Sequence, residues 1–411
     1  MRRAIVWLAL VCTLAPLAPA ATAASAASLD LLGNFDPGSP GFNASAVGLD
    51  GIAYLGSWGG AGQCPSLGVR VIDIHDPANA QQVSTAAAYT GTTAEHLAAV
   101  SVTNPTFVGN VLFAGIQRCV AGGGAPSGLA IWDVTDPANP AELSFFSTGR
   151  NGRGVHEFTV RQRGDRWYAF LAVSNSEATG GPGDLRIVDV TNPRNPVAVA
   201  DWGARRDAGL PIGSGEQCAP TCRGSTPQSF LHSVALSPNG RIAYLSYWDL
   251  GVIVLDVSEP STPTWLGHFS EPTAAEGNTH SVSVAHGGSL ALIADETGAP
   301  PWGRLRLVDV QDPSNPIQVG VFDTANGEAG TPGEQYAYSI HNPLADDRDP
   351  NRAYLAWYAD GVRVLDVTDG AHPVEVNAWL PPREPFVWNV AFLGNLLLVG
   401  DVNHGLYVLE R

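Results

Sequence analysis

The chain has 411 residues, with 22 basic residues, all of them arginine, against 39 acidic residues, and a formal net charge of −17 at pH 7. This charge excludes a protein that binds nucleic acid or an anionic membrane through a basic face. The absence of lysine also excludes a phosphate-loop lysine and a Schiff-base lysine.

The N-terminal residues 1–27 have the pattern of a cleaved signal peptide. Arg2 and Arg3 precede an apolar stretch that ends at Leu17, and several small residues follow it up to Ala27. The stretch is too short to cross a membrane, and no later segment offers the roughly 18 apolar residues that a spanning helix needs. We therefore expect an exported protein, secreted or at the cell surface, without a membrane span.

Six copies of a short β-branched segment that ends in aspartate and a β-branched residue recur along the chain. A proline-bearing turn follows each copy, such as Asp-Pro-Ala-Asn-Pro at residues 136–140. The interval between copies, roughly 44 to 67 residues, is close to the length of a four-stranded propeller blade. The copies lie at residues 68–74, 128–134, 184–190, 251–257, 304–310 and 361–367.

Each interval contains four candidate strands that are apolar on both faces, as expected when blades stack face to face. In the fourth interval they lie at residues 231–236, 241–247, 251–257 and 263–269. Residues 29–36 resemble an outer strand with no blade before it, and residues 405–410 resemble a third strand with no outer strand after it. Because pairing these two segments would hide two sheet edges, we predict an all-β fold: one seven-bladed β-propeller over residues 28–411, closed by its N-terminal and C-terminal strands.

The segment Leu307-Val-Asp-Val310 and the turn that follows it, Asp312-Pro-Ser-Asn-Pro316, are typical of these repeats. They resemble the LVIVD repeat family of secreted bacterial β-propellers, and the resemblance covers essentially the whole chain after residue 27. It implies the propeller fold and an exported or surface location. It implies no particular activity.

Four cysteines remain after residue 27, an even number that favours two disulfides in an oxidising compartment. Cys218 and Cys222 are expected to close a small loop. Cys64 and Cys119 occupy equivalent loops ahead of two consecutive repeats, so a repeat fold permits a bridge between them.

The repeated aspartates stand one per blade, which distributes them around a ring rather than at one site. An aspartate beside a turn can accept backbone N–H groups and fix the hairpin. We therefore interpret them as structural residues: Asp73, Asp133, Asp189, Asp256, Asp309 and Asp366.

Histidines are placed differently, because His96, His156, His232 and His280 each fall at the start of a predicted inner strand. The other blades carry Ala44, Tyr338 and Trp388 at the matching position. Since inner strands line the channel of a propeller, four consecutive blades would present imidazoles to one axis.

Imidazole clusters suit zinc, copper, iron or nickel, and the carboxylates Glu95, Glu157 and Glu276 are close in sequence. One interpretation is therefore a single transition metal ion held by the four histidines. The alternative is that these histidines only form structural hydrogen bonds to neighbouring loops.

The loops that leave each second strand should reach the same mouth, together with a long insertion at residues 203–230. Loops pinned by a disulfide on a rigid ring commonly form a recognition surface. The predicted ligand-binding residues of this rim are Tyr338, Trp388, Trp248, Asp249, Asp295, Asp360, Asp401 and His404.

Two functions follow from these features. The first is a monomeric exported binding or scaffold module, whose channel mouth holds an extracellular protein, a glycan or a small ligand. The second is a metal-dependent enzyme, an oxidoreductase or hydrolase, with the four histidines as ligands and Glu157 as acid or base. No recognisable catalytic motif is present, which favours the first.

Overall fold

The computed structural model describes residues 29–38, 41–59, 63–120, 123–218, 222, 227–271 and 277–411. The predicted signal peptide, residues 1–27, and Glu276 lie outside the described residues. Within these ranges, no helix is long and apolar enough to cross a membrane.

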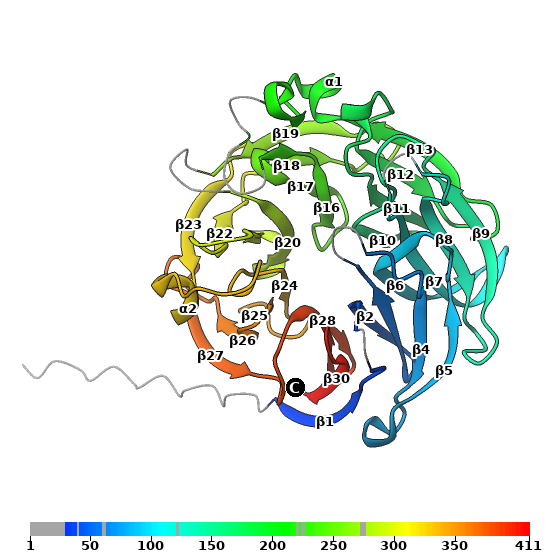
Figure 1. Ribbon diagram of the computed structural model, residues 1–411. Coiled ribbons are helices and arrows are strands. Elements are labelled where there is room, and N and C mark those ends of the chain that lie inside the picture. Colours follow the sequence, from blue (N-terminus) through cyan, green and yellow to red (C-terminus); the bar gives the residue numbers. More distant parts are fainter. Residues whose placement is uncertain are drawn as a thin grey trace, which may run out of the picture.

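The protein has an all-β, propeller-like fold in which sheets surround a common centre (Figure 1). Three sheets of four antiparallel strands follow one another in chain order, each built from consecutive strands. Their strands are β16 (Leu231–Leu236), β17 (Ile242–Tyr247), β18 (Gly251–Asp256), β19 (Thr264–Phe269), β20 (Thr279–Ala285), β21 (Leu290–Asp295), β22 (Leu305–Asp309), β23 (Ile317–Phe322), β24 (Asn342–Ala345), β25 (Arg352–Trp357), β26 (Gly361–Asp366) and β27 (Val374–Trp379).

A fourth sheet of this kind precedes them, and an eight-stranded sheet precedes that one. The eight-stranded sheet contains two consecutive groups of four strands, joined only by the pairing of Ser57 with Ala94. The strands of the eight-stranded sheet are β2 (Asn43–Leu49), β3 (Ile52–Ser57), β4 (Val69–Asp73), β5 (Gln81–Ala86), β6 (Thr92–Asn104), β7 (Phe107–Arg118), β8 (Gly128–Asp133) and β9 (Ala141–Ser147). Those of the fourth four-stranded sheet are β10 (Phe158–Arg163), β11 (Arg166–Ala172), β12 (Leu185–Asp189) and β13 (Val197–Trp202).

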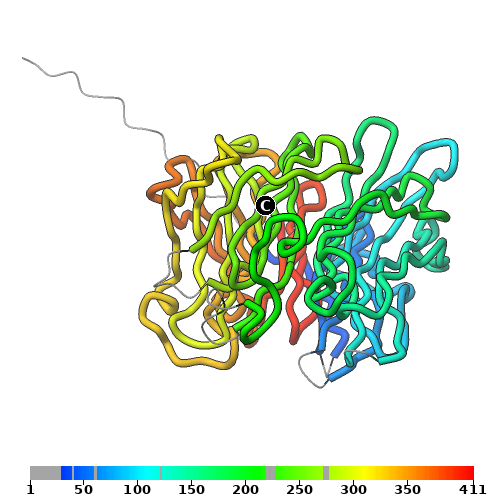
Figure 2. Tube along the Cα trace, turned by 90° about the horizontal axis from the view of Figure 1, so that it is seen from above, coloured from blue at the N-terminus to red at the C-terminus, as the bar shows by residue number. Residues whose placement is uncertain are grey.

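The last sheet unites the two ends of the described chain. β1 (Asp30–Phe35) pairs antiparallel with β30 (Gly405–Glu410), which continues through β29 (Leu396–Asp401) to β28 (Val387–Leu393). In the view turned by 90°, N-terminal strands in blue lie near the C-terminal strands in red (Figure 2). Besides five short 3-10 helices, the described residues form four further short elements: α1 (Ala204–Ala208), β14 (Gly213–Ser214), β15 (Gln228–Ser229) and α2 (Ala325–Ala329).

The hydrophobic core lies between adjacent sheets. Leu185 and Ile187 of β12, for example, pack in one cluster with Leu245 of β17 and Ile253 of β18, and all four are fully buried. Apolar residues on both faces of the middle strands therefore serve two neighbouring interfaces, as the sequence predicted.

The repeat aspartates fix the turns. The Oδ1 atom of Asp256 accepts a hydrogen bond from the N–H of Ser258, two residues further on, at 2.7 Å. The same bond, at 2.8–3.0 Å, is made by Asp73, Asp133, Asp189, Asp309 and Asp366. Their structural interpretation is confirmed.

Both predicted disulfides are present. Cys64 bonds to Cys119, and Cys218 bonds to Cys222. The first bridge links the segment between β3 and β4 to the residue that follows β7, so it ties together the two halves of the eight-stranded sheet.

Candidate metal centre in the central cavity

A one-residue bulge near the start of the inner strand positions the candidate ligands. Leu231 pairs with Tyr247 and Ser233 pairs with Ser246, which leaves His232 as the extra residue. A bulge changes the direction of a side chain relative to a regular strand. Corresponding register shifts occur in β2, β6, β20 and β28.

The strand registers define which residues are equivalent to His232 in the other sheets. In each sheet, the last residue of the third strand serves as a fixed reference point. Its pairing with the second strand, and the pairing of the second strand with the first, identify the corresponding residue of the first strand. Counting through both pairings gives the equivalent positions Ala44, Glu95, His156, His280, His341 and Trp388.

The structure therefore brings together His156, His232 and His280, as predicted, and adds His341. The prediction had aligned Tyr338 with this position, three residues too early. His341 is followed by Asn342, and His232 and His280 are each followed by serine. This shared pattern of histidine and a small polar residue could have identified His341.

His96 does not belong to this set, because the register of β6 puts Glu95 at the equivalent position. The His96 ring is half-buried and packs edge-on against Phe158, with ring centroids 5.0 Å apart. The prediction was one residue off because the sequence does not reveal which of two bulge residues faces the channel.

The four imidazoles form a continuous row. Ring centroids are 4.1 Å apart for His156 and His232, 3.9 Å for His232 and His280, and 4.1 Å for His280 and His341. The indole of Trp388 continues the row at 4.2 Å from His341. All four histidines are more than nine-tenths buried.

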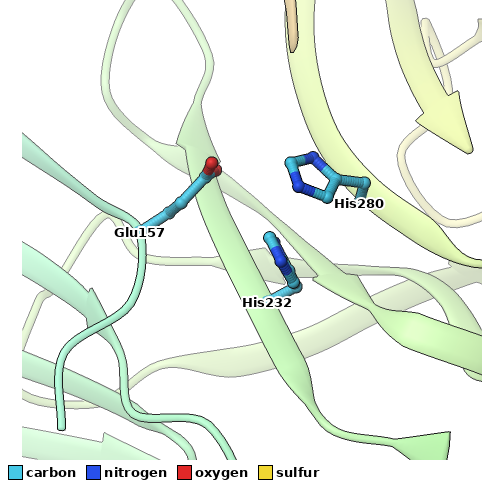
Figure 3. A group of neighbouring side chains, drawn as sticks. All are labelled: Glu157, His232 and His280. Atoms are coloured by element: carbon cyan, nitrogen blue, oxygen red, sulfur yellow. The ribbon is translucent and has the colours of Figure 1, made fainter. Parts of the chain in front are cut away.

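Two overlapping groups in this row have the geometry to hold a metal ion. One contains Glu157, His232 and His280, whose side chains point toward one another (Figure 3), and the other contains His280, Glu296 and His341. Within each group the candidate ligand atoms all lie within 4.8 Å of one another. His280 belongs to both groups and is the centre of the arrangement.

Among the four imidazoles, His156 makes the closest contact with a carboxylate, whereas Nε2 of His280 lies 3.9 Å from Oε2 of Glu296. The Nδ1 atom of His156 lies 2.8 Å from Oε2 of Glu95, which also accepts a hydrogen bond from Nε2 of Gln117 at 3.0 Å. Its Nε2 atom lies 2.7 Å from Nε2 of His232, so one of these two nitrogens carries a proton. Glu95 thus orients His156 toward the row.

Burial sets the charge of these groups. It lowers the pKa of His341 to about 3, and burial together with neighbouring imidazoles lowers the pKa values of His232 and His280 well below their usual range. For His156, burial alone would lower the pKa, but the charge and hydrogen bond of Glu95 outweigh it and raise the pKa. Three imidazoles are therefore neutral, the form that coordinates metals.

Burial shifts the pKa values of carboxylic acids in the opposite direction from those of imidazoles. Burial raises the pKa values of Glu157 and Glu296 to about 8 each, against an ordinary value of 4.5. Two Nδ1 atoms of the row, those of His232 and His280, are buried without a hydrogen-bond partner in the described part of the chain. Desolvated carboxyl groups beside unpartnered nitrogens are costly unless a cation binds them.

An aromatic cup surrounds the imidazole row. The cavity is open to solvent on one side and has a volume of about 330 Å³, and arginine is absent from its described lining. The hydroxyl of Tyr358 donates a hydrogen bond to Oε1 of Glu296, and Tyr358 has a φ of 30°. The cup consists of Phe42, Trp58, Tyr336, Tyr358, Phe386 and Trp388.

The carboxylates predicted for the rim are mostly engaged within the protein. Asp295 pairs with Arg306 at 2.6 Å, and Asp360 accepts hydrogen bonds from Thr324 and Asn326 at 2.5 and 2.7 Å. The neighbour of Asp295, Glu296, is the residue that faces the cavity.

Asp401 accepts the backbone N–H groups of Phe386, Asn403 and His404, and Nδ1 of His404 lies 3.6 Å from Asp36. Both residues therefore support the loop after β29.

The other predicted rim residues also contact neighbouring parts of the protein. Asp249 accepts the N–H of Gln228 at 3.0 Å, and Trp248 stacks on Phe230. The Tyr338 carbonyl accepts a hydrogen bond from the Trp357 indole. Of the eight residues predicted for the rim, Trp388 alone is among the described lining of the cavity.

Comparison with known proteins identifies the repeat class. Residues 232–270 and 276–324 match the LVIVD repeat family. Over these residues the match confirms the LVIVD resemblance seen in the sequence. None of the curated proteins matches the chain.

Solved structures support the fold. The periplasmic gluconolactonase of Pseudomonas aeruginosa aligns with a TM-score of 0.60 at 15% identity, over 85% of this chain and 89% of that one. The Raptor protein of Chaetomium thermophilum aligns with a TM-score of 0.58 at 14% identity, over 93% of this chain and 29% of that one. At such identities the likeness concerns the fold alone.

Proposed function

We propose that the protein binds one transition metal ion in the central cavity and acts as a metal-dependent enzyme on a small molecule held in the aromatic cup. The observation that carries this proposal is the convergence of four buried imidazoles from four successive sheets on one row, with Glu157 and Glu296 within reach. Imidazole with carboxylate suits zinc, copper, iron or nickel.

The donor set supports the metal in three respects. The imidazoles of His232, His280 and His341 are neutral, so no proton has to leave before they bind. Glu95 orients His156, as carboxylates commonly orient imidazoles next to a metal. A bound cation would also restore the charge of the buried Glu157 and Glu296.

A binding or scaffold role at the rim is the second candidate. In that role the aromatic cup would contact the bound partner, which would be an extracellular protein, a glycan or a small ligand. The internal hydrogen bonds of Asp295, Asp360 and Asp401 leave these carboxylates less to offer a partner, which favours the metal-dependent role.

The architecture proposed around this site is a seven-bladed ring. Because β3 and β6 share a single residue pair, we count the eight-stranded sheet as two separate blades. With the four sheets that follow and the sheet that unites β1 with β30, the blades number seven. We further propose that residues 28–411 form one monomeric domain, exported after removal of residues 1–27; the two disulfides support the oxidising compartment.

Elemental analysis of protein purified without added metal tests the metal site. We expect near one equivalent of a transition metal in the wild type and its loss in His280→Ala, because His280 belongs to both ligand groups. His404→Ala is the matched control and should retain the metal, as should His96→Ala.

Should His280→Ala fold poorly, His341→Ala provides the second variant, with thermal unfolding measured for both. A wild type without metal, or a His280→Ala protein with unchanged metal content, contradicts the proposal.

A further inference from the structure

We infer that the aromatic cup is a subsite for a small, uncharged aromatic molecule that carries one hydroxyl group. The orientation of this molecule, with its hydroxyl toward the imidazole row, rests on the proposed metal. The recognition of its ring rests on the cup alone.

The cup offers ring faces and edges from several directions. The Trp58 and Trp388 ring centroids lie 6.3 Å apart with planes tilted by 36°, and Tyr358 and Phe386 lie 4.5 Å apart at 42°. Trp58 also lies 5.9 Å from His156, so it bridges the cup and the row. Aromatic rings gain energy from such offset and edge-on contacts beyond simple burial. A planar ring is therefore favoured over an aliphatic one of similar size.

The charge of the cavity excludes most ionic ligands. An anion such as a phosphate would be buried without a cationic side chain, because the described lining has no arginine and the chain has no lysine. A quaternary ammonium could contact the ring faces, but both carboxylates of the described lining already have internal partners, Glu95 with His156 and Glu296 with the Tyr358 hydroxyl. The lining therefore favours a neutral ligand over one that needs a charged partner.

The cavity size restricts the ligand further. A volume of about 330 Å³ is at the lower end of the range for small-molecule sites, which suits one or two fused rings. The polar lining of the cavity consists of the imidazoles, Glu95, Glu296 and the amides of Gln63 and Gln335. A single hydroxyl group on the ligand would therefore find hydrogen-bond partners in the imidazole row.

Isothermal titration of the protein with p-cresol and with its saturated analogue 4-methylcyclohexanol tests this inference. We expect p-cresol to bind about tenfold more tightly than the analogue. Trp58→Ala should abolish that preference. Trp265→Ala is the matched control: Trp265 lies on the outer strand β19, 38% exposed, and its loss should leave the preference intact.

Equal affinity for both compounds, no binding of either, or an unchanged preference in Trp58→Ala overturns the inference. If Trp58→Ala unfolds, Phe42→Ala replaces it, with the same expectation.

Titration of chelator-treated protein separates this inference from the metal proposal. If the protein prefers p-cresol but never binds metal, the aromatic subsite is supported and the metal proposal is rejected. If the protein binds stoichiometric metal but does not prefer p-cresol, the metal proposal is supported and the aromatic subsite is rejected.

Discussion

Glu157 shows how one buried side chain links stability to the metal. Its pKa is raised to about 8, first because burial disfavours its charge and also because Glu95 and Glu296 lie near it; the His156 charge opposes this. In the metal-free protein it therefore binds a proton in the folded state at pH values where the unfolded chain has released it. A cation beside His232 and His280 would compensate the charge.

The first prediction concerns this group in metal-free protein. Because the folded-state pKa lies above the ordinary value of 4.5, the contribution of Glu157 to folding stability is fully present below pH 4.5 and is lost as pH rises toward about 8. Between pH 5 and 8 the wild type should lose on the order of a few kcal/mol of unfolding free energy through this group, and Glu157→Gln should not show that loss. Urea unfolding at several pH values measures the change.

The exposed Glu259→Gln provides the control and should keep the wild-type slope. Identical pH slopes for wild type and Glu157→Gln would show that the carboxyl group is not desolvated in the folded protein.

Individual residues also show how far sequence reasoning reaches. His156, His232 and His280 were predictable, because each precedes a segment with the composition of a strand. His341 was missed, because Pro343 interrupts the strand pattern that follows it, and only the pairing of a histidine with a small polar residue pointed to it. Glu95 and His96 share one bulge, and choosing between them depends on hydrogen-bond register, which a single sequence does not encode.

At the scale of elements, the turns and the disulfides were predicted more fully than the site. The aspartate turns depend on local contacts two residues apart, and local contacts leave a pattern in sequence. The rim depends on loops whose carboxylates find partners far along the chain, such as Asp360 with Thr324. Such contacts leave no short-range signal, so the predicted rim overestimated the free acidic surface.

The second prediction compares the two disulfides. Cys64–Cys119 closes a loop with a sequence separation of 55, whereas Cys218–Cys222 has a separation of 4. Chain entropy then predicts a loss of about 4 kcal/mol for Cys64→Ala/Cys119→Ala and about 2 kcal/mol for Cys218→Ala/Cys222→Ala. Denaturant unfolding of both double variants measures the difference.

The wild type under oxidising conditions serves as the reference for both. A larger loss on removal of the short loop would contradict the chain-entropy account and would indicate that the Cys218–Cys222 segment supports the fold through native contacts.

At the scale of the whole molecule, the two ends of the described chain share one sheet, and the proposed closure of the ring would give the imidazole row its common centre. β1 lies beside β30 with Asp30 opposite Glu410 and Phe35 opposite Leu406. This pairing was predicted from two incomplete repeats at the chain ends. The row would not converge if the sheets were arranged along a line.

The third prediction tests this closure. A chain that begins at residue 37 lacks β1, so the edge of β30 becomes exposed. We expect its thermal midpoint to fall by several degrees and the protein to associate through the free edge. Differential scanning calorimetry and size-exclusion chromatography measure both effects.

A chain that begins at residue 28 is the control, because it retains β1 and lacks only the proposed signal peptide. Matching midpoints for the two truncated chains would show that β1 does not contribute to closure.

The metal site proposed in the central cavity is tested most directly by anomalous X-ray diffraction from crystals of protein purified without added metal. We predict one anomalous peak between His280 and its neighbours, with imidazole nitrogens about 2.0–2.1 Å away if the ion is zinc. A cavity without an anomalous peak, or a peak located away from His232, His280 and His341, would contradict the account.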